Sequence, residues 1–505
     1  MRRSDVAYTL SLLVIGLLTF LAVVLSGGDL IAAIAPVVAA ALLYAAVFAP
    51  LRACVLALMF LALVADAPQD YPMNGLWESP LYSIGELLCN NWSKTFGIRS
   101  LSFSGMDALA LLLVARSMIS PRSRPLSGPL RYSLWAFITT IVAMAGIGIL
   151  NGGAVDPAYW QVRQLIYLPV FAWLLSQALE TPEDHQLLVP VILGAALVKT
   201  AVGLYFHFAV AGPRELHSPV ILSHSETMLF CLSITLVVVR WLEQPDAKSF
   251  TRCLWFVPTI LAAIWLNDRR IAYVGLGAVA VLVWKLARAN AAKRAVARAG
   301  RVAVPLFAIY AMAGWSSDAT IFKPVASIRT IVSPRNVEEA GSDSSTRWRD
   351  IENFNLSQTM RTHPLGTGLG HEYVEVVKAP DISIEFPLYR YIPHNSVLWS
   401  MTVSGPAGFV LLWSLFVVAM YLAARSLRMS RTPLERISAL ASLSALLLFL
   451  IQAWGDMGTQ NWSTTWLAAA AIAVAHNLAL STGAWPMPFS LPETARSLRL
   501  RTVEA

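Results

Sequence analysis

The chain has 505 residues, of which 56% are hydrophobic and only 13% are charged, and its formal net charge is +8. Soluble domains average roughly 45–50% apolar and about 25% charged residues, so a soluble fold could not bury this much apolar surface. The four cysteines lack the paired spacing of zinc ligands or of a disulfide framework. The composition therefore excludes soluble, disordered, fibrous and disulfide-rich secreted proteins and indicates a polytopic membrane protein.

Apolar blocks recur along the chain, and a helix needs about twenty apolar residues to cross a bilayer. These blocks predict an all-α protein with about fourteen transmembrane helices, in a range of about 12–14. The first block has no small-residue cleavage pattern and leads directly into the next, so it is interpreted as a retained span. The predicted spans are 7–26, 30–49, 51–65, 104–120, 132–150, 161–180, 187–211, 219–241, 253–267, 271–289, 302–315, 395–424, 435–454 and 463–481.

Lysine and arginine residues gather in alternate connections between these spans, and such residues favour the cytoplasmic side of a membrane. Alternation then predicts that both termini are cytoplasmic and that connections 66–103 and 316–394 lie on the outer side. Because the basic residues flank apolar blocks, they indicate topology and not a nucleic-acid partner. Aromatic residues within 316–394 predict an ordered, partly helical loop.

Arg269 and Arg270 are adjacent at the predicted outer end of a span. Two guanidinium groups at the hydrocarbon boundary are costly unless they reach lipid headgroups or hold a ligand. The planar guanidinium binds phosphate oxygens through two parallel hydrogen bonds. These two residues are therefore candidate phosphate ligands, and the alternative is that they anchor the helix at the membrane surface.

Two polar segments stand out in the predicted outer loop. The first contains Arg347 and Arg349, and the second runs from His363 through a glycine-rich stretch to His371. No strand precedes these glycines, so they predict a tight backbone turn and not a dinucleotide-binding motif. The cations of the first segment either bind an anionic partner or pair with acidic residues of the loop itself.

His394 ends the loop immediately before the next span. An imidazole with an ordinary pKa near 6.5 suits a proton acceptor, and a hydrogen-bonded structural histidine is the alternative. Arg163, at the outer start of another span, is either a further phosphate ligand or a lipid anchor. Asp456, between the last two spans, either pairs with an arginine of the site or caps a helix.

Together and in this order, these segments resemble the O-antigen ligase/polymerase superfamily of bacterial membrane glycosyltransferases. The resemblance covers residues 250–425 and extends to the N-terminal half only as a series of helices. It is carried by Arg269 and Arg270 at the head of a span, Arg347 and Arg349, the segment His363-Pro-Leu-Gly-Thr-Gly-Leu-Gly370, His394-Asn395-Ser396, and Gly405-Pro-Ala-Gly408.

That superfamily implies a GT-C-like fold and a metal-independent, inverting glycosyl transfer without a cofactor. The donor would be a glycan on undecaprenyl pyrophosphate, and the acceptor a sugar hydroxyl at the periplasmic face of the bacterial inner membrane. The family's Ser-Arg-Gly segment reads Arg269-Arg270-Ile271 here, which leaves the register open. By motif, the pyrophosphate ligands are Arg270 (alternate Arg269) and Arg349 (alternate Arg347), the acceptor histidine is His394, and further candidate substrate-binding residues are Arg163, His363, His371 and Asp456.

The resemblance divides the chain into N-terminal transmembrane helices (1–250), a ligase/polymerase-like core (251–425), C-terminal transmembrane helices (426–484) and a cytoplasmic tail (485–505). It implies a polymerase of lipid-linked oligosaccharide repeat units in O-antigen or exopolysaccharide biosynthesis, working in the phospholipid bilayer beside other polysaccharide-assembly membrane proteins. The extra spans and the connection 66–103 favour polymerisation. The alternatives are a ligase that transfers the glycan to lipid A–core and a transporter of polysaccharide or lipid.

Overall fold

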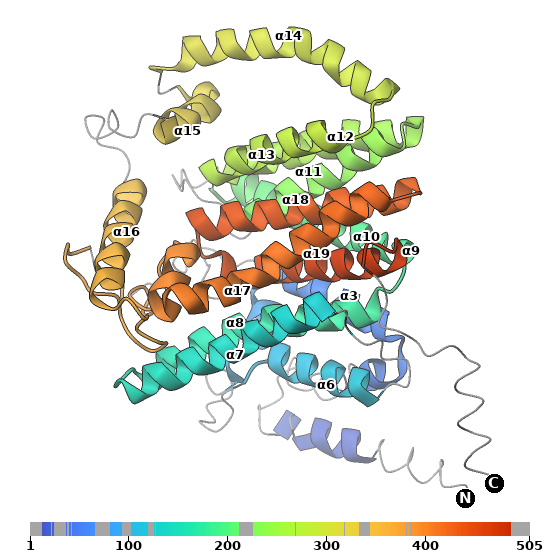
Figure 1. Ribbon diagram of the computed structural model, residues 1–505. Helices are drawn as coiled ribbons and strands as arrows, with labels where there is room; N and C mark the ends of the chain where they lie inside the picture. Colours follow the sequence, from blue (N-terminus) through green and yellow to red (C-terminus); the bar gives the residue numbers. More distant parts are fainter. Residues whose placement is uncertain are drawn as a thin grey trace, which may run out of the picture.

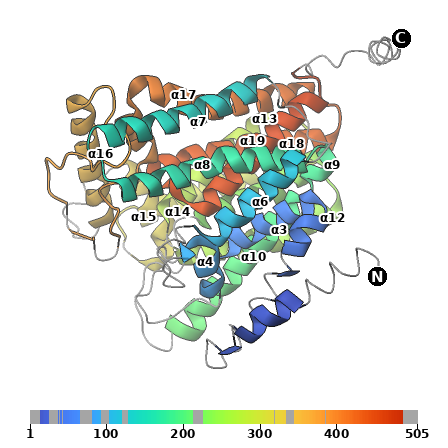
Figure 2. The same ribbon diagram turned by 90° about the horizontal axis from the view of Figure 1, so that it is seen from below.

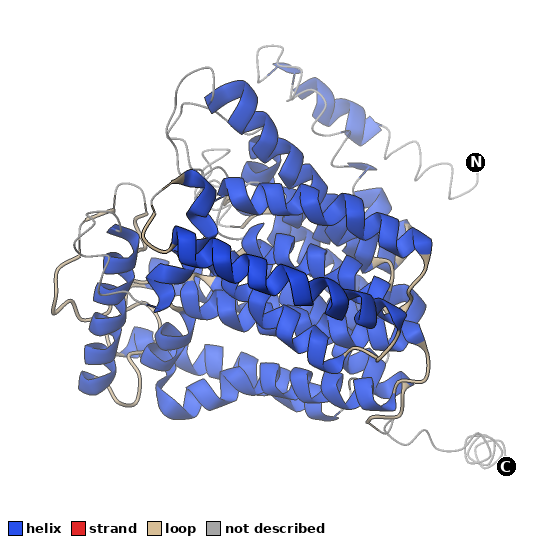
Figure 3. Cartoon of the chain, turned by 90° about the horizontal axis from the view of Figure 1, so that it is seen from above, coloured by secondary structure: helices blue, strands red, loops and turns tan. Residues whose placement is uncertain are grey.

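The computed structural model describes most of the chain after residue 42. Its regular elements within the described residues are helices (Figure 3), so the all-α expectation is confirmed there. The described ranges are 13–21, 23–24, 37, 40–41, 43–65, 81–92, 103–119, 126, 128–211, 226–267, 269–317, 319–332, 344–379, 381–383 and 386–485.

The longest interval between two long helices lies between α14 and α17. The N-terminal part contains α3 (Leu51–Val64), α4 (Tyr82–Cys89), α6 (Gly105–Ile119), α7 (Gly128–Leu150), α8 (Val155–Ala178), α9 (Pro182–His185), α10 (Leu188–Tyr205) and the π-helical η2 (Phe206–Ala211). The middle contains α11 (Glu226–Glu243), α12 (Ala247–Asn267), α13 (Arg270–Leu286), α14 (Ala291–Gly314), η4 (Thr320–Phe322), α15 (Lys323–Val332) and α16 (Ser344–Thr362). The C-terminal part contains α17 (Ser396–Met429), α18 (Pro433–Gly455), η6 (Gly458–Gln460) and α19 (Trp462–Ser481).

Several of these helices are long and apolar enough to cross a membrane, which confirms a polytopic membrane protein. Every predicted span from 51–65 onward overlaps a described helix. The spans 7–26 and 30–49 and the connection 66–103 are only partly described, so the total of about fourteen stays a prediction. Among the described residues the structure has seven such spans: Gly128–Leu150, Pro182–Val210, Ala247–Asn267, Ala291–Gly314, Ser396–Met429, Pro433–Gly455 and Trp462–Ser481.

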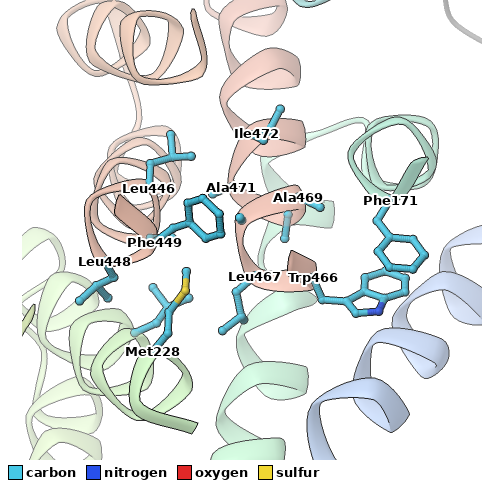
Figure 4. Close-up of a cluster of buried hydrophobic side chains, with 14 of the residues drawn as sticks. Phe171, Met228, Leu446, Leu448, Phe449, Trp466, Leu467, Ala469, Ala471 and Ile472 are labelled. Carbon is cyan, nitrogen blue, oxygen red and sulfur yellow. The ribbon is translucent and has the colours of Figure 1, made fainter. Parts of the chain in front are cut away.

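The long helices α7, α8, α17, α18 and α19 run side by side, and the shorter α16 lies across one end of them (Figures 1 and 2). The core of the bundle is built from aromatic pairs between these helices. Phe171 of α8 stacks on Trp466 of α19 with ring centroids 3.8 Å apart (Figure 4), and Phe416 of α17 stacks on Phe449 of α18 at 4.8 Å. Small alanines let the neighbouring helices approach α19 closely, which makes it the central helix.

Helix α14 differs from α19 because it lies at the edge of the bundle (Figure 1). Of its residues, only Ala292 and Gly314, near its two ends, are buried. It begins at Ala291, well before the apolar block predicted at 302–315. The side chain of Asn290 accepts a hydrogen bond from the backbone N–H of Lys293, and such a cap stabilises a helix start. The basic, alanine-rich segment therefore continues the helix beyond its apolar part.

Helix α17 is kinked at Gly405 and Pro406, and this kink positions the site. Gly405 has non-helical backbone angles (φ 63°, ψ 179°), and Pro406 has no N–H to donate to the carbonyl of Thr402, four residues earlier. That carbonyl instead accepts from the backbone N–H of Thr367 at 3.1 Å. The kink thus provides a docking place for the connection between α16 and α17.

Candidate functional site

The glycine-rich stretch after α16 forms the tight turn that the sequence predicts. Gly368 has a φ of +78°, and a Cβ at this position would lie 2.3 Å from the backbone nitrogen of Gly148 in α7. Its own N–H donates to the carbonyl of Val403 at 2.9 Å, and the next N–H, of Leu369, donates to Met144 at 3.0 Å. The turn is therefore pressed between α7 and the kinked α17, where only glycine fits.

Two histidines flank this turn in different environments. His363 is exposed, and its Nδ1 lies 2.9 Å from the hydroxyl of Thr362. His371 is half-buried, and its Nε2 lies 3.0 Å from the carbonyl oxygen of Gly148. His371 therefore packs against the end of α7, whereas the side chain of His363 is exposed.

His394 lies directly before α17 and faces α16. Its Nδ1 is 2.8 Å from Oε2 of Glu352, and its backbone N–H donates to the same oxygen at 3.3 Å. The side chain of Glu352 is 1% exposed, whereas that of His394 is 19% exposed and so remains within reach of a ligand. The next residue, Asn395, caps α17 by accepting from the N–H of Leu398 at 3.0 Å.

Arg349 lies one turn before Glu352 on α16, a spacing that places two residues on the same face of a helix. Arg349 is half-buried, and its positive charge acts on His394. Arg347 is exposed. Of the two registers that the sequence allowed for this segment, the structure brings Arg349 to the histidine.

Asp456 ends α18 on another side of the same site. It is 2% exposed, and one of its carboxylate oxygens accepts from the N–H of Met457 at 2.9 Å. Its backbone carbonyl accepts from the hydroxyl of Ser396, at the start of α17, at 3.4 Å. The turn after α18 is thereby fixed beside the head of α17.

The charges around His394 raise its pKa above the ordinary value of 6.5. Burial of the ring lowers this pKa, but the hydrogen bond and negative charge of Glu352 and the charge of Asp456 outweigh that effect. Arg349 opposes them and lowers the pKa. Opposite charges favour the protonated ring, so the site stabilises an imidazolium that has taken up a proton.

Arg269 and Arg270 stand at the head of α13, and both are half-buried. Arg269 is the extended residue before the helix (φ −99°, ψ 111°), and Arg270 begins it. The following side chain, of Ile271, reaches the end of α18, because a Cβ on Gly455 would lie 2.5 Å from its Cδ1. The head of α13 therefore adjoins Asp456, the same residue whose charge acts on the histidine.

Arg163 has a different set of partners. It is 4% exposed, and its guanidinium forms an ion pair with Asp107 of α6 at 2.6 Å. It also donates to the side chain of Asn91 at 2.7 Å and lies over the ring of Trp160 at 4.9 Å. None of these partners belongs to the group around His394, so the structure gives Arg163 a role in joining α6 to α8.

Glu352 and Gln161 hold residues of the site in place, although neither has a role that the sequence predicts. Gln161, in α8, is fully buried, and its side chain donates to the carbonyl of Tyr391 at 2.7 Å and accepts from the N–H of Gly370 at 2.8 Å. Residues two apart on a helix are separated by roughly 200°, which is why Gln161 faces the loop while Arg163 faces α6. A polar residue inside an apolar span was the available signal for Gln161.

Comparison with known proteins identifies no family: no protein-family model matches the chain, and no curated protein matches it.

Proposed function

We propose that this protein is a membrane glycosyltransferase that polymerises oligosaccharide repeat units carried on undecaprenyl pyrophosphate. The observation that carries the proposal is the meeting of Arg349, His394 and Asp456 at one end of the bundle, with Arg270 on the adjoining helix head. This group contains cations for a diphosphate and an imidazole for a proton. The resemblance to the O-antigen ligase/polymerase superfamily involves the same residues.

The transfer breaks the bond between the anomeric carbon of the donor sugar and the pyrophosphate oxygen. The oxygen of an acceptor hydroxyl attacks the opposite face of that carbon, so the configuration inverts, and the bonding electron pair leaves with undecaprenyl pyrophosphate. Arg270 and Arg349 stabilise the negative charge that develops on the leaving oxygen, since fixed cations in a partly buried site act without reorganisation. Arg269 and Arg347 are the alternate residues for these positions.

His394 takes the proton from the attacking hydroxyl. Its raised pKa makes the ring basic enough to accept a proton, and Asp456 stabilises the resulting charge. A pyrophosphate is a good leaving group, so a modest base suffices. The growing glycan is transferred from its lipid carrier to the next lipid-linked repeat unit. The chain therefore lengthens at its reducing end.

The test is elongation by the purified protein in lipid nanodiscs. Given lipid-linked repeat units and no other acceptor, we expect products that contain multiple units, with or without EDTA. A protein that is inert until lipid A–core is added is instead a ligase. No transfer to either acceptor would refute a glycosyltransferase. Elongation that survives the loss of both Arg270 and His394 would refute the assigned site.

Single-residue variants distinguish a specific role of Arg270 and Arg349 from a general effect of losing a positive charge. Removal of one fixed donor to a developing charge lowers turnover by about 10²–10³-fold, and we expect this range for Arg270→Gln and Arg349→Gln. Arg361→Gln is the matched control, because Arg361 is exposed at the far end of the same α16 helix. Equal losses in Arg349→Gln and Arg361→Gln would contradict a specific role for Arg349.

A further inference from the structure

Glu352 places a buried carboxylate against His394. Two N–H groups of one residue, the backbone N–H and Nδ1–H, converge on the single oxygen Oε2. A carboxylate only accepts hydrogen bonds, so Nδ1 must carry the ring proton. The other nitrogen, Nε2, is then the one that holds the lone pair in the neutral ring.

Besides the bond from the N–H of His394 to Glu352, the backbone around His394 is held by contacts that do not involve Glu352. Asn395 caps α17 through the N–H of Leu398, and the hydroxyl of Ser396 bonds to the turn after α18. Further along the same α16 face, Asn355 accepts from the N–H groups of Val376 and Val377, both at 3.0 Å. Because these bonds already dock the loop, the hydrogen bond that Glu352 accepts from Nδ1 of His394 acts mainly on the orientation and tautomer of the ring.

The second carboxylate oxygen of Glu352, Oε1, is buried and has no hydrogen-bond partner among the described residues. A buried carboxylate kept only for stability would be expected to satisfy both oxygens. Here the bonding is concentrated on the oxygen that faces His394. The arrangement resembles the acid that orients a histidine base in hydrolytic triads, where the carboxylate holds the tautomer and stabilises the imidazolium.

We infer that Glu352 is a positioning residue, which fixes His394 with Nδ1–H toward its carboxylate so that Nε2 accepts the proton of the acceptor-sugar hydroxyl. The catalytic part of this inference rests on the proposed glycosyl transfer. The hydroxyl proton passes to Nε2 as its oxygen bonds to the anomeric carbon, and Glu352 remains ionised throughout. The charged groups that act on the ring include Glu352 and Arg349 from α16 and Asp456 from the end of α18.

A first experiment measures the His394–Glu352 coupling without any transfer reaction. Diethyl pyrocarbonate modifies neutral imidazole, so the pH dependence of modification reports the protonation of each histidine. Trypsin releases His394 in the peptide Tyr391–Arg425, which contains no other histidine, so mass spectrometry reads it separately. In Glu352→Gln we expect half-maximal modification of His394 at lower pH than in the wild type, and in Glu352→Asp a return toward the wild-type value.

Glu375→Gln is the matched control, because Glu375 is a carboxylate of the same loop that pairs with Arg390 at 3.3 Å. It should leave the modification profile of His394 unchanged. An unchanged profile in Glu352→Gln would overturn the inference, as would an equal shift in the control variant.

A second experiment measures elongation. In Glu352→Gln we expect turnover to fall by about ten- to a hundredfold, with little change in KM for the lipid-linked donor, and the acid limb of the pH profile to move to lower pH. Glu375→Gln should keep wild-type turnover. A shifted modification profile with unchanged turnover would overturn the positioning role. Failure of the wild type to elongate would refute the proposed function and, with it, the catalytic role of Glu352, while the modification profile would still decide whether Glu352 acts on His394.

Discussion

Arg436 and Glu243 form a bidentate ion pair at the end of the bundle away from His394. Nε of Arg436 donates to Oε2 of Glu243 at 2.7 Å, and Nη2 donates to Oε1 at 3.3 Å. The same guanidinium donates to the carbonyl of Leu286 at 3.0 Å, so the pair joins the ends of α11, α13 and α18. Asp456 lies at the other end of α18, roughly 30 Å away for a helix of this length. The pair therefore fixes the helices that carry the site.

Loss of either charge of this pair should destabilise the protein strongly. The side chain of Glu243 is fully buried, and a buried charge left without its partner costs about 3–5 kcal/mol. We expect Glu243→Gln and Arg436→Met each to lower the free energy of unfolding by about this amount, measured by denaturant titration in detergent. The double variant Glu243→Gln/Arg436→Met should lose less than the sum of the two single variants. Additive losses would show that the two residues do not depend on each other.

The helices themselves were predictable because the hydrocarbon thickness of the bilayer sets the length of apolar block that can cross it. The boundaries were less so, since capping residues such as Asn290 extend α14 into a basic segment that hydropathy assigns to a connection. The glycine-rich turn was also predictable from its residues. Its docking against α7 was not, because the approach of Gly368 to Gly148 depends on where the chain returns in space.

The sequence predicted which residues belong to the candidate site. It did not predict how those residues are arranged in space. The meeting of Arg349 with His394 requires α16 to lie across the bundle end, and that position is supported by the hydrogen bonds that Asn355 accepts from the loop N–H groups of Val376 and Val377. Glu352 belongs to the same polar segment as Arg347 and Arg349, but nothing in the sequence pairs it with His394, and Gln161 belongs to no motif. Their importance follows from burial and from the hydrogen bonds they make, which are properties of the folded chain.

Gly368→Ala should destabilise the docked turn. A positive φ costs roughly 1–2 kcal/mol for a residue with a Cβ, and the 2.3 Å approach to the backbone of Gly148 adds a steric cost. We expect a total of about 2 kcal/mol or more in thermal unfolding of the detergent-solubilised protein. Gly152→Ala isolates the two effects, because Gly152 also has a positive φ but has nothing within 4 Å of its Cβ position. Equal losses in both variants would mean that packing contributes nothing.

Gln161→Leu should release the loop segment before α17. The change leaves the part-buried carbonyl of Tyr391 and the buried N–H of Gly370 without their partner, and an unsatisfied buried polar group costs about 1–3 kcal/mol. We expect faster tryptic cleavage at Arg390 in limited proteolysis. The control is Gln164→Leu, since Oε1 of Gln164 is buried without a hydrogen-bond partner among the described residues. Cleavage that accelerates equally in both variants would contradict the assigned role of Gln161.

The stabilisation that His394 provides should depend on pH. Because the folded protein holds the pKa of His394 above 6.5, the folded state binds its proton more tightly than the unfolded state does. The contribution is therefore complete below about pH 6.5 and is lost as pH rises through the raised pKa. We expect His394→Gln to cost about 1.5–3 kcal/mol at pH 5.5, the range for a hydrogen bond to a charged group, and less at pH 9.

Unfolding midpoints of the two proteins across this pH range provide the measurement. In a Glu352→Gln background the pH dependence of the His394→Gln effect should become weaker, because the hydrogen bond and the charge of Glu352 are the largest effects that raise the pKa of His394. A cost that grows between pH 5.5 and pH 9 would mean that the folded protein favours the neutral ring, and the charge assignment around His394 would then be wrong.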